Sequence, residues 1–312
     1  MLAVVGPTGT GKTALAIHLA HALDAELIGC DALQVYRGFD VATAKPTSAE
    51  RAAVPHHLVD VQDPGKDFTL ARFVALAERC IRETRRRGRQ PILVGGTGMY
   101  LRGLLRGIVH APEVDARLRE RLKAIRARRG DPAMHRWLAR IDPASAERLA
   151  PADAQRVNRA LEWWITSGVR WSDHLAETGT WEGRRERFRC LKIGLDGERD
   201  WLWARLEARV EGFFAAGLVE EVRSLLAAGI SPDRNAFKAI GYREVVAAVR
   251  SGGPTEDLVQ RVQFATRRYA RRQRKWFLRE PDIVWLDAAV GAEELTRQAL
   301  AAWERFCGTD PN

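Results

Sequence analysis

The stretch that decides the fold of this chain is Gly6-Pro7-Thr8-Gly9-Thr10-Gly11-Lys12-Thr13. Its spacing, G-x-x-x-x-G-K-T, is that of a phosphate-binding P-loop. An apolar run at residues 2–5 precedes it and predicts a strand, and a helical pattern at residues 14–23 follows it. A strand, a loop and a helix in this order are the context that a P-loop requires. This context favours phosphate binding over a glycine-rich turn with an incidental lysine.

The residue types in this loop suit an anion. Glycines let successive backbone N–H groups turn inward around a phosphate, and the start of the following helix adds partial positive charge. Lys12 would reach a terminal phosphate, and the hydroxyl of Thr13 suits Mg²⁺. Taken alone, the loop predicts an ATP or GTP site, so the rest of the chain has to identify the phosphorylated ligand.

Composition sets broad limits. With 312 residues, of which 46% are hydrophobic, the chain is long enough for two domains or for one large domain with an insertion. The formal net charge of +10 favours a polyanionic partner, either a nucleic acid or a membrane surface. Because only seven of the fifty basic residues are lysines, codon bias is an alternative explanation for part of the arginine content. The positions of the arginines, rather than their number, therefore have to show whether the protein binds a polyanion.

Cysteine usage and hydropathy indicate the compartment. The four cysteines lie far apart without a C-x-x-C pair, so we expect neither a zinc site nor a disulfide framework. No stretch approaches the 18 apolar residues of a membrane span, and the run before Gly6 lacks the basic flank of a signal peptide. We expect a cytoplasmic monomer with no membrane partner.

The second predicted strand, at residues 25–30, ends in Asp31. Ligands of open α/β sheets bind outside the carboxyl ends of the strands, which would bring Asp31 beside the P-loop. A cap for the following turn explains the same residue equally well. Further on, His56 and His57 enter a third strand. Since neighbours on a strand point to opposite faces, packing roles are favoured over a shared metal ion.

A helix predicted at residues 68–87 leads to a buried strand at 91–94 and then to Gly95-Gly96-Thr97-Gly98-Met99-Tyr100. Many P-loop NTPases end such a strand in an Asp that organises Mg²⁺, and this chain has Gly95 there. Small residues at a strand end indicate close approach of a ligand or another backbone.

Residues 112–189 are polar, arginine-rich and helical in pattern, without a convincing strand. They predict an inserted helical domain at residues 112–188, between core segments at 1–111 and 189–312. Within it, Gln155, Arg156 and Arg159 lie close together at helical spacing. A solvated helix face is the alternative.

A helix predicted at residues 255–279 has an apolar stripe, which we assign to the core. The stripe consists of Leu258, Val262, Ala265, Tyr269 and Trp276. Outside it are seven cations, with no acidic residue before Glu280: Arg267, Arg268, Arg271, Arg272, Arg274, Lys275 and Arg279. Because a solvated helix normally mixes charges, this run favours an anionic partner.

Two more strands, at residues 188–195 and 282–286, and helices at 199–216, 219–228 and 293–307 complete the prediction. The expected fold class is α/β: a P-loop NTPase-like core with a parallel sheet flanked by helices, plus an all-helical inserted domain. Such a chain would be an enzyme that acts on a phosphorylated small molecule and a nucleic acid.

Eight motifs, in order along nearly the whole chain, resemble those of the tRNA dimethylallyltransferases, also called tRNA isopentenyltransferases. They are the P-loop, Asp31-Ala32-Leu33-Gln34, Thr43-Ala44-Lys45-Pro46-Thr47, Pro55-His56-His57-Leu58, Gly95-Gly96-Thr97-Gly98-Met99-Tyr100, Gln155-Arg156-Val157-Asn158-Arg159-Ala160-Leu161-Glu162, Ala239-Ile240-Gly241-Tyr242-Arg243 and Arg271-Arg272-Gln273-Arg274-Lys275-Trp276-Phe277. The complete set is highly specific. Departures are small: the family usually has Ser at Ala32 and Gly at Ala42, and its P-loop more often contains T-A-S-G-K.

The resemblance implies transfer of a dimethylallyl group from dimethylallyl diphosphate to the exocyclic amine of the adenosine 3′ to the anticodon of tRNA. The P-loop, with Lys12 and a Mg²⁺ ion on Thr13, would stabilise the departing diphosphate. Asp31 would be the general base, and Thr97 would help to orient the target nucleotide. The implied tRNA-binding residues are Asp31, Ala32, Leu33, Gln34, Thr97, Arg119, Gln155, Arg156, Val157, Asn158, Arg159, Lys238, Arg243, Arg271, Arg272, Gln273 and Lys275.

Two alternatives belong to other classes. A P-loop kinase of a nucleoside or another small metabolite would explain the loop, but it would leave the basic helix unexplained and would need the Asp that Gly95 replaces. A non-catalytic RNA-binding module would explain the basic helix and retain only a nucleotide fold.

Overall fold

The structure, a computed structural model, describes residues 1–108, 115–179, 183–251 and 257–309. The chain divides into two compact units. The core unit comprises residues 1–107 and 187–312, and the insertion unit comprises residues 108–186. The boundary expected between residues 111 and 112 and the helix start expected at Thr255 lie outside the described residues.

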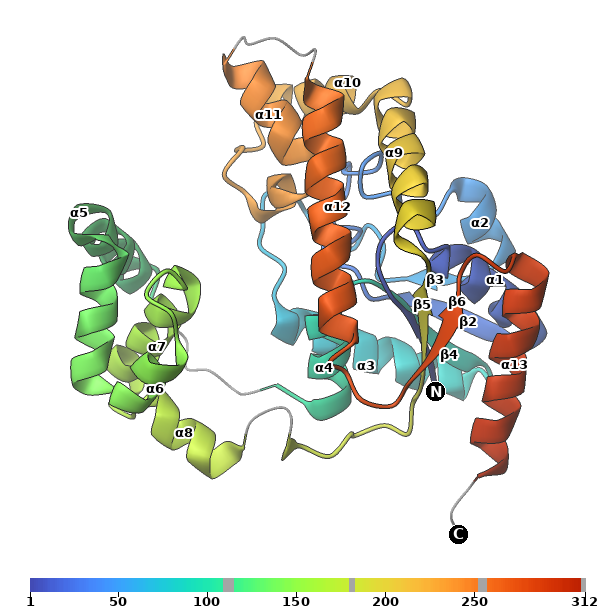
Figure 1. The fold of residues 1–312 in the computed structure, drawn as a ribbon, viewed down its shortest axis with the longest axis horizontal. Coiled ribbons are helices and arrows are strands. Elements are labelled where there is room, and N and C mark those ends of the chain that lie inside the picture. Colours follow the sequence, from blue (N-terminus) through green and yellow to red (C-terminus); the bar gives the residue numbers. More distant parts are fainter. Residues whose placement is uncertain (109–114, 180–182, 252–256, 310–312) are drawn as a thin grey trace. The chain divides into compact units, whose positions relative to one another are not determined.

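The core unit is built on a six-stranded sheet in the order β3-β2-β4-β1-β5-β6 (Figure 1). The strands are β1 (Leu2–Val5), β2 (Ala25–Gly29), β3 (His56–His57), β4 (Gln90–Gly95), β5 (Leu191–Asp196) and β6 (Ile283–Asp287). Every pairing is parallel, which confirms the expected fold class. β1 lies between β4 and β5, and Val5 is in register with Gly95. The segments that leave the carboxyl ends of β1, β2 and β4 therefore meet at one edge of the sheet.

Helices flank this sheet, as expected for parallel strands joined by crossovers. Of the helices in the core unit, α1 (Lys12–Ala22), α3 (Leu70–Arg86) and α13 (Ala292–Gly308) pack against its strands. The core unit also contains α2 (Ser48–Ala53), α4 (Gly98–Arg106), α9 (Arg199–Ala215), α10 (Leu218–Ala227), α11 (Tyr242–Ser251) and α12 (Leu258–Phe277). Within the described ranges, none of the chain's helices has both the length and the apolar character needed to cross a membrane.

Helices α2, α4 and α11 were not predicted from the sequence. A capping box formed by Thr47 and Glu50 starts the short helix α2. The glycines of α4 lower its helix propensity, so the sequence does not indicate a helix there. Gly98 is nevertheless needed, because a larger residue would not fit against its neighbour. A Cβ on Gly98 would lie 2.1 Å from the ring of Trp276. Packing between segments distant in sequence therefore decides this helix.

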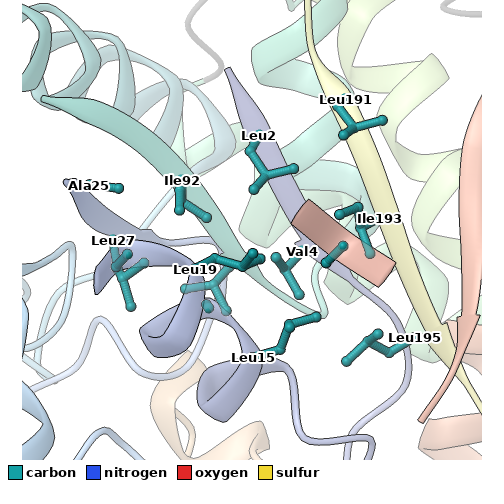
Figure 2. Close-up of a cluster of buried hydrophobic side chains, with 14 of the residues drawn as sticks. Leu2, Val4, Leu15, Leu19, Ala25, Leu27, Ile92, Leu191, Ile193 and Leu195 are labelled. Atoms are coloured by element: carbon teal, nitrogen blue, oxygen red, sulfur yellow. The ribbon is translucent and has the colours of Figure 1, made fainter. Parts of the chain in front are cut away.

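The main core lies between the sheet and the helices α1 and α13. Leu15 and Leu19 of α1 lie against Val4 of β1 and its neighbours (Figure 2). All four residues of β1 are buried, and fully burying a leucine or valine side chain contributes roughly 1.5–3 kcal/mol. This packing holds β1 and α1 on either side of the P-loop.

Helix α12 lies along α9 (Figure 1). The residues that it buries differ in part from the predicted apolar stripe. The buried residues of α12 are Leu258, Val262, Thr266, Ala270, Gln273 and Phe277. Ala265, Tyr269 and Trp276 are only half-buried. Two of the buried positions are polar, and their hydrogen bonds are satisfied inside the protein: the hydroxyl of Thr266 donates to the carbonyl of Val262 at 2.7 Å. Hydropathy alone cannot reveal such positions.

The described part of the insertion unit is helical, as predicted. It consists of α5 (Ala116–Ile141), α6 (Pro143–Arg148), α7 (Ala154–Ser167) and α8 (Trp171–Thr178). α5 is interrupted at Gly130, where φ is 74° and Pro132 follows. The unit has its own hydrophobic core around Leu122, Leu138 and Leu161, and every residue of this core belongs to the unit itself.

Candidate active site

A pocket of about 630 Å³ lies at the carboxyl edge of the sheet. Its lining comes from the P-loop, the segments that follow β2 and β4, and the helices α9 and α12. All of these residues belong to the core unit. The pocket therefore forms at the place where ligands of open α/β sheets bind.

The P-loop has the backbone of an anion site. Gly6, Gly9 and Gly11 have φ values of 136°, 87° and 83°, which favour glycine. At Gly6 a Cβ would also lie 2.3 Å from the carbonyl oxygen of Leu195. No side chain caps α1, and its first turn has no acidic residue. The amino end of α1 thus keeps its N–H groups and partial positive charge for a ligand.

Lys12 lines the pocket and donates to the carbonyl of Pro7 at 2.6 Å. Burial, together with the nearby positive charge of Arg209, lowers the pKa of Lys12 to about 7, and the negative charge of Asp31 partly opposes this shift. A bound diphosphate would favour the charged ammonium and reverse the shift. The lysine is thus poised to take up a proton when an anion binds.

Arg205 and Arg209 of α9 also line the pocket, although no motif in the sequence predicted them. Arg205 donates to the carbonyl of Gly9 at 2.9 Å, which fixes it against the P-loop. Burial lowers the pKa of Arg209, and the carboxylate of Asp31 opposes that effect. The available signal was an arginine pair at i, i+4 in the helix after β5. These two arginines make the P-loop end of the pocket positive, and Lys12 adds its charge when it is protonated.

Asp31 combines the two roles that its position suggested. Its Oδ1 accepts hydrogen bonds from the N–H groups of Leu33 at 2.9 Å and Gln34 at 3.4 Å, which caps the turn after β2. Its Oδ2 has no hydrogen-bond partner among the described residues. Because Asp31 lines the same pocket as Lys12, one carboxylate oxygen holds the turn while the other is available to a ligand of the pocket.

Thr97 lies behind the pocket lining rather than in it. Its hydroxyl oxygen accepts the N–H of Ala32 at 3.1 Å, and its own N–H donates to the carbonyl of Cys30 at 3.2 Å. A Cβ on Gly95 would lie 2.2 Å from that same carbonyl oxygen. The small residues after β4 therefore allow the backbone that carries Asp31 to come close. The sequence predicted either a ligand or another backbone near these small residues, and the structure shows the backbone.

Gln273, implied as a tRNA-binding residue, is buried and directs its side-chain amide at the protein. Its Oε1 accepts the N–H of Thr8 at 2.9 Å, and its Nε2 donates to the carbonyl of Gly96 at 2.9 Å. The hydrogen bonds thus connect α12 to the P-loop and to the segment after β4. In the structure Gln273 positions the pocket wall.

Gln34 and His56 line the pocket, whereas His57 does not. The Nε2 of Gln34 donates to the carbonyls of Thr43 and Ala44, each at 3.0 Å. The two histidines contact different partners: His57 pairs with buried Glu26 at 2.7 Å, whereas the Nδ1 of His56 bonds the carbonyl of Val54. They do not share a ligand position.

The implied RNA contacts in the core unit fall into two groups. Lys238, Arg243 and Arg272 line the pocket, whereas Arg271 and Lys275 lie on α12 outside it. All five are exposed. The single-sign run on α12 is partly neutralised, contrary to the prediction, because Arg267 pairs with Glu207 and Arg274 with Asp196. These partners lie far away in sequence, so the run alone could not reveal them.

In the insertion unit, α7 carries most of the implied contacts. Gln155 and Arg156 are exposed, and Arg156 pairs with Asp153 at 2.7 Å. Glu162 accepts Arg159 at 3.1 Å and lies 3.8 Å from Arg119, which brings these two cations together. Asn158 is half-buried. Val157 is buried in the unit's core, so its side chain serves packing.

The parallel sheet, the P-loop and the cation-lined pocket define a P-loop α/β protein that binds a phosphorylated ligand. A family model described as IPP transferase matches residues 34–280, and a second one, isopentenyl transferase, matches residues 1–58. A protein of Anaeromyxobacter dehalogenans named tRNA dimethylallyltransferase is 47% identical over 96% of this chain and 98% of its own length. The chain belongs to the IPP transferase family, a family of prenyl-transferring enzymes.

Two solved structures are similar along the whole chain. The tRNA isopentenylpyrophosphate transferase of Bacillus halodurans is 34% identical, with a TM-score of 0.72, over 98% of this chain and 97% of that one. A eukaryotic dimethylallyltransferase, described as acting on tRNA, is 27% identical with a TM-score of 0.85. That match covers 100% of this chain and 80% of the eukaryotic one.

Proposed function

We propose that this enzyme transfers a dimethylallyl group from dimethylallyl diphosphate to N6 of the adenosine 3′-adjacent to the anticodon of tRNA, adenosine 37. The products are diphosphate and N6-(dimethylallyl)adenosine. The observation that carries the proposal is one pocket that joins a P-loop and three cations to the free oxygen of Asp31. The names of the relatives support the prenyl donor and the tRNA acceptor.

The donor half of the pocket would stabilise the leaving group. As the bond between C1 of the dimethylallyl group and the diphosphate oxygen breaks, negative charge develops on that oxygen. The P-loop N–H groups, Lys12 and Arg205 are held in place before the reaction and would face this charge together with Arg209. Preorganised donors of this kind are usually the largest single contribution to catalysis.

Mg²⁺ fits this donor half. Thr13 in the first turn of α1 lines the pocket, and the described residues contain no cluster of three His, Cys, Asp or Glu that would build a protein-held metal site. Mg²⁺ usually needs few protein ligands, because substrate phosphates and water complete its shell. When bound at Thr13, the ion would neutralise part of the charge of the diphosphate.

The acceptor half would activate the nucleophile. N6 of adenine attacks C1, the N–C bond forms as the C–O bond breaks, and a proton leaves N6. Asp31 Oδ2 would take this proton, while Oδ1 keeps the turn in place through Leu33 and Gln34. General-base catalysis contributes typically ~10²- to 10⁴-fold.

The RNA would be held by cations of both units. Lys238, Arg243 and Arg272 line the pocket that the target base would enter, after leaving its stack at a cost of about a few kcal/mol. The exposed residues of α7 and α12 would contact the phosphate backbone of the anticodon stem-loop. Since the substrate is tRNA, we place the enzyme in the cytoplasm, which suits its four free cysteines.

One assay separates this function from the kinase and RNA-binding alternatives. The enzyme is incubated with labelled dimethylallyl diphosphate, γ-labelled ATP and an anticodon stem-loop RNA, and the position of each label is followed. We expect the prenyl label on the RNA. Phosphate transfer would support a kinase instead, and RNA binding without transfer would support a non-catalytic module.

A further inference from the structure

A second cavity, of about 360 Å³, lies beside the active-site pocket. It is lined by Phe264 and by four arginines: Arg243, Arg261, Arg268 and Arg272. Ile240, Arg243 and Arg272 line both cavities. A ligand that extends out of the active site past these shared residues would therefore enter the second cavity.

Phe264 is the most exposed large hydrophobic residue among the described ones, at 59%. It lies on a face of α12 different from the buried one, with Arg261 three residues before it and Arg268 four residues after it, so the three side chains are neighbours. The guanidinium of Arg268 lies 5.8 Å from the centre of the Phe264 ring. An exposed aromatic ring beside guanidinium groups is a surface on which a nucleic-acid base can stack.

The charge of this cavity is positive and largely uncompensated. Its one acidic lining residue, Glu244, already accepts the guanidinium of Arg243 at 2.6 Å and the N–H of Gly241 at 2.9 Å. Arg261 and Arg268 have no carboxylate partner among the described residues. An apolar protein segment on Phe264 would leave these charges unpaired, whereas a nucleotide provides both a base and a phosphate.

We propose that this second cavity binds an unpaired nucleotide of the anticodon loop next to the target adenosine. Its base stacks on Phe264, and its phosphate contacts Arg261 and Arg268. This inference rests on the proposed function, because it needs an RNA whose target base occupies the adjoining pocket. Stacking uses the π-face that every base has, so the cavity would position the loop with little selection for sequence.

The test uses the full-length enzyme and an anticodon stem-loop with 2-aminopurine at one loop position at a time. Phe264→Ala should weaken RNA binding about tenfold and remove the fluorescence quenching at one loop position next to the target. Phe264→Trp should restore both, whereas Leu278→Ala, which alters a side chain that is 55% exposed at the end of α12, should have no effect. Unchanged affinity of Phe264→Ala for dimethylallyl diphosphate checks the fold.

The salt dependence of RNA binding distinguishes the contact to the phosphate from the contact to the base. Arg268→Gln should reduce the slope of log K against log salt by roughly 0.7–0.9, which is one phosphate contact, whereas Phe264→Ala should leave the slope unchanged. Arg305→Gln on α13 is the matched control. Wild-type RNA affinity and quenching in Phe264→Ala, with prenyl transfer intact, would overturn the inference alone. An inactive wild-type enzyme that does not bind RNA would overturn the proposed function, and the inference with it.

Discussion

The P-loop pocket and the arginine face of α12, which consists of Arg271, Arg272 and Lys275, are both cationic, but they are built differently. In the pocket, Lys12 and Arg205 each donate to a carbonyl of the P-loop, and Gln273 holds the loop from behind. On α12, Arg271 and Lys275 are exposed, without a carboxylate partner among the described residues. A site whose donors are fixed and partly desolvated suits a developing charge, whereas exposed surface cations suit a long polyanion. The two regions should therefore respond differently to substitution.

The largest expected effect is that of Asp31→Asn in the pocket. The amide oxygen can keep the hydrogen bonds from Leu33 and Gln34, but the side chain can no longer accept a proton. Single-turnover transfer should fall ~10²- to 10⁴-fold, while anticodon stem-loop affinity changes little. Turnover equal to that of the wild type would remove Asp31 as the general base.

The next effect is that of Lys12→Ala. Loss of a charged donor to the diphosphate corresponds to about 1.5–3 kcal/mol, so the KM for dimethylallyl diphosphate should rise roughly 10- to 150-fold. The KM for tRNA should stay near its wild-type value. A normal donor KM would contradict the assignment of the P-loop to the donor.

The pH dependence of donor binding sharpens the same point. Lys12 has a pKa lowered to about 7, so at pH 8 it is mostly neutral before the donor binds. A bound diphosphate raises the pKa again, and binding should then take up close to one proton and weaken as the pH rises above 7. Calorimetry at pH 8 in two buffers of different ionisation enthalpy measures this uptake. Lys12→Met should abolish it, and equal heats in both buffers for the wild type would refute the coupling.

The arginine face should respond through salt. The double substitution Arg271→Ala and Arg272→Ala should weaken tRNA binding and reduce the salt slope by about two phosphate contacts. Donor affinity should change far less than in Lys12→Ala. A slope identical to that of the wild type would exclude this face from the RNA interface. Arg223→Ala on α10 provides the control for a lost surface charge.

The smallest expected effect joins the two regions. Gln273→Leu keeps the approximate volume but leaves the N–H of Thr8 and the carbonyl of Gly96 without their partner. Each buried unpaired group costs about 1–3 kcal/mol, so the melting temperature should fall by several degrees and the donor KM should rise a few-fold. A variant with wild-type melting and donor KM would show that Gln273 does not position the P-loop.

Much of the fold was predictable because its signals are local. Around the P-loop, the strand, the loop and the helix follow one another directly in the sequence. Elsewhere in the core, short apolar runs that predict strands alternate with helical patterns, and these runs identify most of the strands of the sheet. Helix α4 and the phase of α12 were not predictable. Gly98 is explained only by the ring of Trp276, and two buried positions of α12, Thr266 and Gln273, are polar.

The sequence by itself determined the phosphate-binding loop and the acidic residue near it, because a motif of eight residues carries its own backbone conformation and parallel strands end at a common edge. Only the tertiary structure decided which other groups complete the pocket. Gln273 reaches the N–H of Thr8 across 265 positions of sequence, and Arg205 reaches Gly9 across 196. Such contacts depend on the packing of α9 against α12 and on the position of both helices beside the P-loop, which no local pattern encodes.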